Sequence, residues 1–377
     1  MVTMRYSRLR APRALAACLL AGLLAACAQP APAPAPGPAA APAPASAPAL
    51  SAAAPSPTDA AGLPPIDTAK VDAIRVAWTA ASGSQTPLWI AYEGGYFQKY
   101  GLDVDLSFVA SSSTAVQAVL ADEIQFSACA GGAPIASRVA GSDMKIISSV
   151  TNVPAFYLMA RPEIRTVEDL RGRRIAIDRR GSSQEVAARM VLRARGMDPD
   201  RDVIWVSTGG GFLEVLAALG SGAADAADFS SPTNLEARKR GYVELVDIAA
   251  QGFPYQGSCL MARESYLNAH PDVARKVVRA YADAIHRYKT DEAFAVDTLI
   301  KYTKIDDREI QHETWRYYAL QLAPEIPYPT PEGIQTVIEE VAATNPQAAS
   351  HQPAEFMDDR FVRELEAAGY FKQLYGK

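Results

Sequence analysis

The residues of this sequence best suited to chemistry are hydroxyl and amide side chains that stand in short loops just before helix-like segments. Five such loops stand out, at residues 82–86, 110–114, 178–183, 207–211 and 229–232. The first N–H groups of a helix have no partner within the helix and carry partial positive charge. Loops of this design favour the capture of a small molecule by hydrogen bonds, and they suit an anion in particular.

Ten residues in and near these loops are predicted to line a binding cleft as hydrogen-bond donors. An arginine among them could grip a carboxylate or a sulfonate through two parallel N–H groups. Taken one by one, each serine could equally be an N-cap that serves only its own helix, and the arginine could be a solvated surface residue. The predicted residues are Ser84, Gln85, Ser112, Ser113, Gly132, Arg180, Ser182, Ser183, Gly210 and Ser231.

The N-terminal residues indicate an export signal. Four arginines precede an uncharged run, residues 14–26, that is shorter than the about 20 residues needed to span a bilayer. The run ends in Leu24-Ala25-Ala26-Cys27, which resembles a lipobox, in which the cysteine receives lipid and becomes the mature N-terminus. We therefore expect a signal peptide at 1–26, lipidation at Cys27, and a place in the cell envelope, facing the periplasm or the exterior. The alternative is an ordinary secretory signal with an incidental cysteine.

Residues 27–70 are almost only Pro, Ala and small polar residues, a composition typical of an extended tether that buries no core. The formal net charge of the whole chain is −5, and it becomes −9 once the four signal arginines are removed. No basic stripe is present, so nucleic acid is excluded as a partner.

The cysteines and histidines suggest neither catalysis nor metal binding. Only Cys129 and Cys259 lie in the predicted exported domain, where we expect two buried thiols. A single disulfide between them is the alternative, if the fold brings them together. The histidines are far apart and all lie in the C-terminal part, so neither cysteine has an evident partner base. No catalytic residue, metal site or cofactor is therefore predicted. The histidines are His270, His286, His312 and His351.

Residues 71–377 exceed what one hydrophobic core usually serves, so two lobes are expected. Apolar strands alternate with helical segments through the first two thirds of this region, which favours an α/β fold with parallel pairing and helices on both faces of each sheet. From residue 264 onward the pattern is helical, without new strands. The predicted strands are 73–78, 102–110, 124–130, 174–178, 203–207 and 224–229, and a single helix is expected at 87–100.

Four segments together resemble the solute-binding proteins of the nitrate/sulfonate/taurine type, which include the SsuA/THI5-like domains. They are residues 86–106, which contain Tyr92-Glu-Gly-Gly-Tyr-Phe97, and residues 115–120, 167–176 and 222–227. The resemblance implies a type II periplasmic-binding-protein fold with a ligand cleft between two lobes and two hinge crossings, near 155–161 and 257–263. Lobe 1 is then 71–155 plus 263–377, and lobe 2 is 156–262 with the hinge segments.

The same resemblance implies a function without catalysis. A substrate-binding lipoprotein of an ABC importer would work as a monomer, close its lobes on a small anionic solute similar to a sulfonate, nitrate or taurine, and dock on an ABC permease in the membrane. Two alternatives stay open. One is an enzyme on the same fold, because some THI5-like relatives make a pyrimidine, and the other is a module that senses a ligand.

Overall fold

A computed structural model of the protein describes residues 62–63 and 66–377. The predicted signal peptide, Cys27 and nearly all of the predicted tether lie outside the described residues. The described residues belong to one compact unit, Thr58–Lys377. None of the helices in this part of the chain combines the length and the apolarity that a membrane crossing requires.

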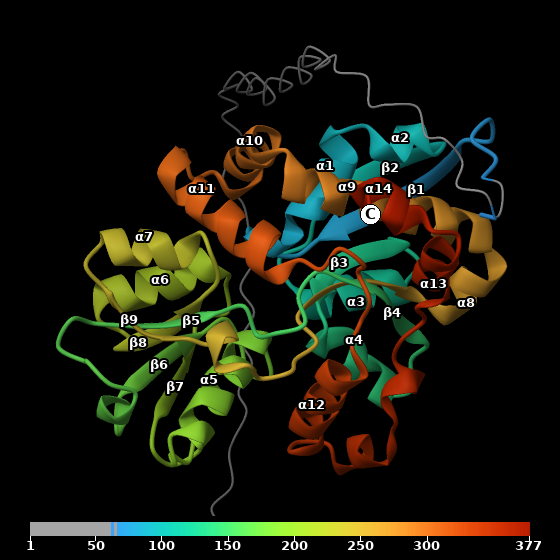
Figure 1. The fold of residues 1–377 in the computed structure, drawn as a ribbon. Coiled ribbons are helices and arrows are strands. Elements are labelled where there is room, and N and C mark those ends of the chain that lie inside the picture. Colours follow the sequence, from blue (N-terminus) through green and yellow to red (C-terminus); the bar gives the residue numbers. More distant parts are fainter. Residues whose placement is uncertain (1–61, 64–65) are drawn as a thin grey trace, which may run out of the picture. The chain divides into compact units, whose positions relative to one another are not determined.

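The first lobe is built on a five-stranded sheet with the order β2-β1-β3-β10-β4 (Figure 1). β1 pairs in parallel with β2 and β3, whereas β10 runs antiparallel between β3 and β4. The last strand therefore completes a sheet that was begun almost two hundred residues earlier. The strands are β1 (Asp72–Trp78), β2 (Leu102–Phe108), β3 (Phe126–Ala130), β4 (Met144–Ser149) and β10 (Ser258–Arg263).

The second lobe repeats this plan with the order β7-β6-β8-β5-β9. β6 pairs in parallel with β7 and β8, and β5 runs antiparallel between β8 and β9. The strands are β5 (Tyr157–Ala160), β6 (Arg174–Ile177), β7 (Ile204–Ser207), β8 (Ala226–Phe229) and β9 (Val243–Asp247).

The predicted parallel pairing holds for β1 with β2 and β3 and for β6 with β7 and β8, but each sheet also contains one antiparallel strand, β10 in the first and β5 in the second. The sequence pattern also does not predict β4, β5, β9 and β10. Strands β4 and β5 are buried along their whole length, and β10 is buried except at its last residue. A strand buried on both faces has no polar alternation, so periodicity does not distinguish it from a buried helix.

The positions predicted for the crossings need correction for the same reason. Residues 157–160 form β5 and residues 258–263 form β10, so the chain crosses at 150–156 and again at 248–257. The two crossings hydrogen-bond to each other: the Tyr255 N–H donates to the Asn152 carbonyl at 3.1 Å, and the Gly257 N–H donates to the Thr151 carbonyl at 3.0 Å. The lobes are therefore joined by a paired, two-strand connection.

Helices cover both faces of each sheet (Figure 1). The predicted helix at 87–100 is two helices, because Gly94-Gly95 interrupts it and Gly95 takes a left-handed φ of 71°. Elsewhere the capping residues follow their usual preferences, with Ser111 and Ser182 as N-caps of α3 and α5. These helices are α1 (Thr86–Glu93), α2 (Tyr96–Lys99), α3 (Ser112–Leu120), α4 (Gly132–Val139), α5 (Ser183–Ala194), α6 (Phe212–Ser221) and α7 (Thr233–Lys239).

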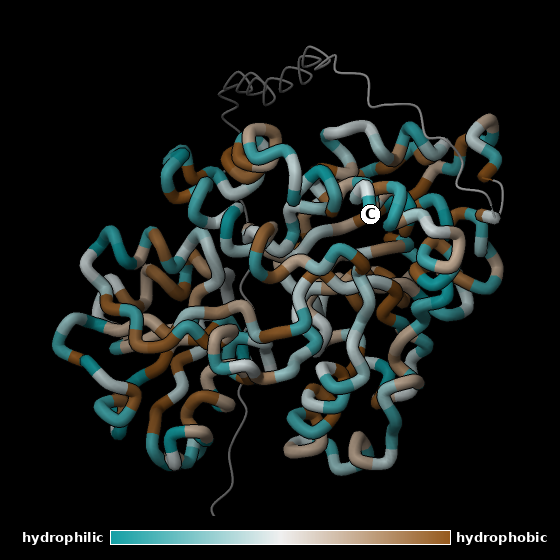
Figure 2. Tube along the Cα trace, viewed as in Figure 1, coloured by the Kyte–Doolittle hydropathy of each residue, from teal (hydrophilic) through white to brown (hydrophobic). Residues whose placement is uncertain are grey.

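The C-terminal helices pack around the first lobe. Hydrophobic residues follow the strands and the inner sides of helices in both lobes, and the outer turns are mostly hydrophilic (Figure 2). A π-helical segment, Arg316–Leu322, continues α11. The helices are α8 (Glu264–Ala269), α9 (Pro271–Thr290), α10 (Glu292–Thr303), α11 (Arg308–Trp315), α12 (Pro331–Ala342), α13 (Arg360–Ala367) and α14 (Tyr370–Tyr375).

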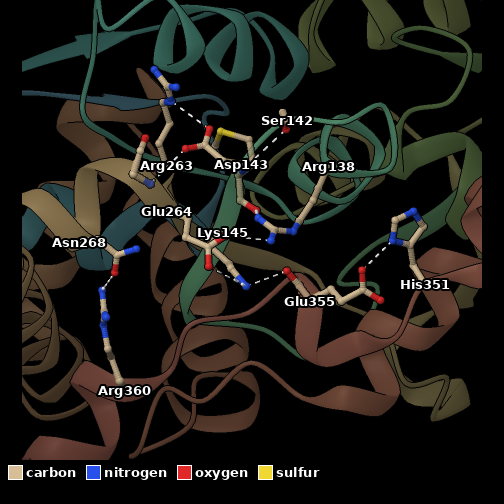
Figure 3. A network of polar contacts seen from close by, with 12 residues as sticks. Arg138, Ser142, Asp143, Lys145, Arg263, Glu264, Asn268, His351, Glu355 and Arg360 are labelled. Atoms are coloured by element: carbon tan, nitrogen blue, oxygen red, sulfur yellow. Dashed lines mark hydrogen bonds and ion pairs between the residues drawn. The ribbon is translucent and has the colours of Figure 1, made fainter.

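A network of polar contacts fixes the segment between α12 and α13 to the first lobe (Figure 3). The buried Lys145 of β4 donates from Nζ to the Glu355 carbonyl at 2.8 Å. Beside this contact, Ile146 and Met357 form an isolated parallel bridge. The end of the chain is thereby fixed against the edge strand of the first sheet.

A second buried network holds α14 against α9 and α2. The Asp283 carboxylate, whose side chain is 4% exposed, accepts from Lys99 Nζ at 2.7 Å. It also accepts from the Tyr100 hydroxyl at 2.7 Å and from the Tyr370 hydroxyl. One carboxylate therefore joins three segments from both ends of the folded unit.

Asp283→Asn should lower the free energy of unfolding by about 3 kcal/mol, because it leaves a partly buried ammonium and two phenols around a neutral amide. Urea denaturation of the full chain measures this. The matched control is Asp297→Asn on α10, whose carboxylate pairs with Arg308 while both side chains are more than half exposed, and which should cost under about 1 kcal/mol. Equal losses in the two variants would contradict a structural role for the buried carboxylate.

Candidate binding cleft

A cavity of about 1060 Å³ lies between the two lobes. It is lined by the loops that follow β1, β2 and β3 in the first lobe and by those that follow β6, β7 and β8 in the second. These are the carboxyl ends of the parallel strands, where α/β sheets form their ligand crevices. Both crossings, through Thr151, Phe156 and Tyr255, also line the cavity.

Nine of the ten predicted residues line this cavity, and Ser231 does not. Ser231 is 2% exposed, its carbonyl accepts from the Gly83 N–H at 3.1 Å, and its hydroxyl donates to the Asn234 side chain at 2.7 Å. This residue forms a contact between the lobes instead of facing the cleft. The residues that line it are Ser84, Gln85, Ser112, Ser113, Gly132, Arg180, Ser182, Ser183 and Gly210.

Several of these side chains are already hydrogen-bonded within the protein. Gln85 donates from Nε2 to the Ser258 hydroxyl at 3.0 Å and accepts from the Thr79 N–H at 3.4 Å. The Ser112 hydroxyl accepts from the Ala130 N–H at 3.1 Å, and Ser182 caps α5. These bonds shape the loops. Ser112 and Ser182 are acceptors in them, so their own O–H groups are not used by these bonds.

The N-termini of α4 and α5 approach each other across the cleft. A Cβ added to Gly132, at the start of α4, would lie 3.8 Å from the Ser183 hydroxyl at the start of α5. The Tyr255 hydroxyl, from the second crossing, donates to the Ser183 hydroxyl at 3.0 Å. Because α4 has no side-chain cap, its first N–H groups have no such partner at the cleft. Two positive helix ends, one from each lobe, thus border one small space.

The arginines that line the cavity are paired with carboxylates. Arg180 contacts Glu185 at 2.8 Å, and Arg189 contacts both Glu185 at 2.8 Å and Asp200 at 2.6 Å. Arg180 is the predicted anion-gripping residue, and its side chain is 54% exposed. Its guanidinium group therefore already has a carboxylate partner in this structure.

A further ion pair joins the lobes at the cleft. Arg193 of α5 pairs with Glu340 of α12, and both residues line the cavity. α12 belongs to the C-terminal part of the chain, from which no cleft residue was predicted. This helix reaches the cleft only because the C-terminal part of the chain packs on the first lobe. No local sequence motif indicates that position.

Burial raises the pKa of two titratable groups at the cleft. Burial raises the pKa of the Tyr255 hydroxyl to about 12, so this phenol remains a neutral donor at physiological pH. Burial also raises the pKa of Asp178, against the hydrogen bonds from the Ser182 side chain and the Arg179 N–H. Among the described residues that line the cavity there is neither a histidine nor a cysteine.

Apolar side chains form a large part of the lining, and the sequence reasoning missed them. Phe156 of the first crossing and Phe212 of α6 lie edge to face with ring centroids 6.4 Å apart. Phe108 and Leu213 line the cavity while 55% and 68% exposed. Phe212 and Leu213 directly follow the predicted glycine loop, so their exposure could have been suspected, whereas Phe156 reaches the cleft only through the crossing.

The family model described as NMT1/THI5 like matches residues 83–291, more than half of the chain. The chain belongs to the NMT1/THI5-like family. The structure is similar to that of the alkanesulfonate-binding protein SsuA from Xanthomonas axonopodis pv. citri bound to MOPS, with a TM-score of 0.65, 16% identity, and coverage of 77% of this chain and 99% of that one. The predicted resemblance and the predicted periplasmic-binding-protein fold are both confirmed.

Curated relatives of this NMT1/THI5-like chain share somewhat more of its sequence than SsuA does. YtlA of Bacillus subtilis (strain 168) is 23% identical over 243 residues, which is 63% of this chain and 72% of YtlA. The riboflavin-binding protein RibY of Chloroflexus aurantiacus is 25% identical over 278 residues, 70% of this chain and 78% of RibY.

One buried acid of this NMT1/THI5-like protein lies two residues before the cleft-lining Ser230. Asp228 of β8 is fully buried, and neither carboxyl oxygen has a hydrogen-bond partner among the residues that the structure describes. Burial raises the pKa of Asp228 well above its usual range, so the folded state favours the protonated acid. A raised carboxyl pKa contributes stability that is complete below the ordinary pKa and is lost as the pH rises through the folded-state pKa.

Asp228→Asn should therefore raise the melting temperature by several degrees at pH 7 and by much less at pH 4, since the amide does not ionise on unfolding. Differential scanning calorimetry across this pH range is the measurement. Asp105→Asn, on the exposed side of β2, is the matched control and should leave the pH profile unchanged. A lower melting temperature for Asp228→Asn at pH 7 would show that the buried carboxyl is stabilising as an anion.

Proposed function

We propose that this protein is an extracytoplasmic solute-binding protein that captures a small solute by lobe closure and delivers it to an ABC permease. The observation that carries the proposal is the cleft itself. Each lobe contributes the carboxyl ends of its parallel strands to one cavity, and a paired two-strand crossing connects the lobes at that cavity. Binding then requires both lobes, so the solute favours the closed state by the contacts that only this state offers.

The closed arrangement is supported by ion pairs between the lobes away from the crossings. Arg193 pairs with Glu340 beside the cleft, and Arg238 of α7 contacts Glu313 of α11 at 3.2 Å. Exposed pairs of this kind contribute about 1 kcal/mol or less each, so they bias the equilibrium without replacing the ligand.

The solute proposed for the cleft is small and carries an acidic group of the sulfonate, nitrate or taurine kind. An acidic group placed between Gly132 and Ser183 would meet N–H groups from both lobes. The apolar walls around Phe156 and Phe212 favour a solute that also has an apolar portion. The name of SsuA points to sulfonates, and the name of RibY points to an aromatic solute of larger size.

The proposal includes the earlier expectations for the N-terminal region. A signal peptide at 1–26 directs export, and lipidation at Cys27 anchors a monomer to the membrane. The tether 27–70 carries the binding unit, which faces the periplasm or the exterior. No cofactor, metal or nucleic acid takes part in this function.

Two other functions would use the same cleft. An enzyme would need a nucleophile beside a base, and the described lining offers tyrosine, serine and carboxylates but neither histidine nor cysteine. A sensor would bind the solute in the same way and report it to a membrane protein. Measuring solute uptake after deletion of the neighbouring permease genes distinguishes delivery from sensing, because only delivery stops.

The first test is a thermal-shift screen of the full chain with alkanesulfonates, taurine, nitrate, aromatic acids and riboflavin. At 100 times its Kd, a true ligand should raise the melting temperature by roughly 5 °C or more, because it binds only the folded state. Small-angle scattering with the same ligand should show a smaller radius of gyration. Tight binding without compaction would contradict capture by lobe closure, and turnover of the ligand would favour the enzyme.

Gly132→Ala tests whether the gap between α4 and α5 receives the acidic group. The added Cβ has ordinary contacts at 3.8 Å and should not unfold the protein, but it narrows the gap and should raise the Kd about tenfold. Isothermal titration calorimetry with the ligand from the screen measures this change. Gly220→Ala in α6, whose Cβ would meet only the Tyr242 hydroxyl at 3.7 Å, should bind as the parent does. Unchanged affinity in both variants would place the acidic group elsewhere.

A further inference from the structure

Two cysteines lie side by side on neighbouring strands of the first sheet. Cys129 of β3 and Cys259 of β10 are direct partners in the antiparallel register, and their Sγ atoms are 4.0 Å apart. Both side chains are fully buried, and both thiols are free in this structure. Directly opposed residues in an antiparallel pair have Cα atoms about 4.5–5.5 Å apart, within the range that a disulfide spans.

The pair belongs to a buried hydrophobic cluster of the first lobe. The two sulfurs lie in a cluster with Ile135 of α4, Tyr255 of the second crossing and Ile334 of α12. Burial raises the pKa of the Cys129 thiol well above its usual range, so little thiolate exists in the folded protein. The pair is thus poorly suited to act as a nucleophile, and its direct juxtaposition points to a different use.

We propose that Cys129 and Cys259 are a modification site that is oxidised to a cross-strand disulfide in the exported protein. The inference rests on export as set out under the proposed function. One thiol, as thiolate, attacks the disulfide of an extracytoplasmic dithiol oxidant and forms a mixed disulfide. The second thiolate then attacks the protein sulfur of that mixed disulfide and releases the oxidant as its dithiol. The two thiol protons pass to solvent or to the leaving thiols, and two electrons pass to the oxidant.

The burial of both thiols sets the time at which the bond forms. β3 is made before the second lobe and β10 after it, so the thiols meet only when β10 enters the first sheet. Until then both are accessible, and afterwards no oxidant reaches them. Oxidation therefore accompanies folding after export.

The bond would enclose residues 129–259, which contain the whole second lobe and both crossings. Its neighbours Ala130 and Ser258 line the cleft, so the disulfide fixes the base of the cleft in the first lobe. Both cysteines belong to that one lobe, and the movement of the lobes about the crossings is left free. The bond should hence change stability and leave ligand affinity unchanged.

The decisive experiment is refolding of the purified full chain, because it depends neither on export nor on a ligand. The reduced protein is unfolded in urea, refolded in a buffer of oxidised and reduced glutathione, unfolded again, and alkylated. Peptide mass mapping at Cys129 and Cys259 should find both unalkylated unless a reductant is added first. Native refolded protein with both thiols alkylated would overturn the disulfide and leave the solute-binding proposal intact.

Two further measurements complete the test. Protein isolated from the cell envelope should give the same peptide masses, and free thiols there would overturn oxidation in the cell. Reductant should lower the melting temperature of the oxidised protein by about 10 °C, given the length of the enclosed loop. The double variant Cys129→Ala, Cys259→Ala should show no response to reductant, and an equal response in parent and double variant would also contradict the bond.

Discussion

The pairing of the two crossings is the constraint on which the rest of the structure depends. Thr151 and Asn152 of the first crossing accept backbone hydrogen bonds from the second, at Gly257 and Tyr255. Because buried backbone groups must be paired, each crossing satisfies the other where the chain leaves one sheet for the next. The paired crossings are a short link between the two sheets, and the carboxyl ends of the parallel strands of both sheets border one cavity.

Several polar side chains that line this cleft also make hydrogen bonds or ion pairs within the protein. Gln85 and Ser112 support their own loops, and Arg180 and Arg189 share Glu185. The start of α4 at Gly132 also lines the cleft, and no side chain caps it. Aromatic side chains complete the lining, with Phe156 and Phe212 packed edge to face.

The sheet of the first lobe is assembled from both ends of the folded unit, so contacts between early and late segments of the chain are needed to hold it together. Strand β10 enters between β3 and β4 only after the second lobe has been made. The Asp283 network, the contacts of Lys145 and the facing cysteines all join early segments to late ones. These buried polar and sulfur contacts lie where the sequence separation, and hence the entropy cost of closing the loop, is largest.

The sequence by itself determined the α/β class, the family, and the loops that become the cleft, because alternation and capping are local and Ser182 caps α5 wherever that helix lies. Only the tertiary structure decided that β5 and β10 run antiparallel in the interior of their sheets. A strand buried on both faces has no polar alternation, so its sequence does not indicate which strands it pairs with. The tertiary structure also decided that Ser231 turns away from the cleft, that Glu340 enters it, and that Gly132 meets Ser183. Each of these outcomes depends on residues brought together from distant parts of the chain by packing, which no local pattern encodes.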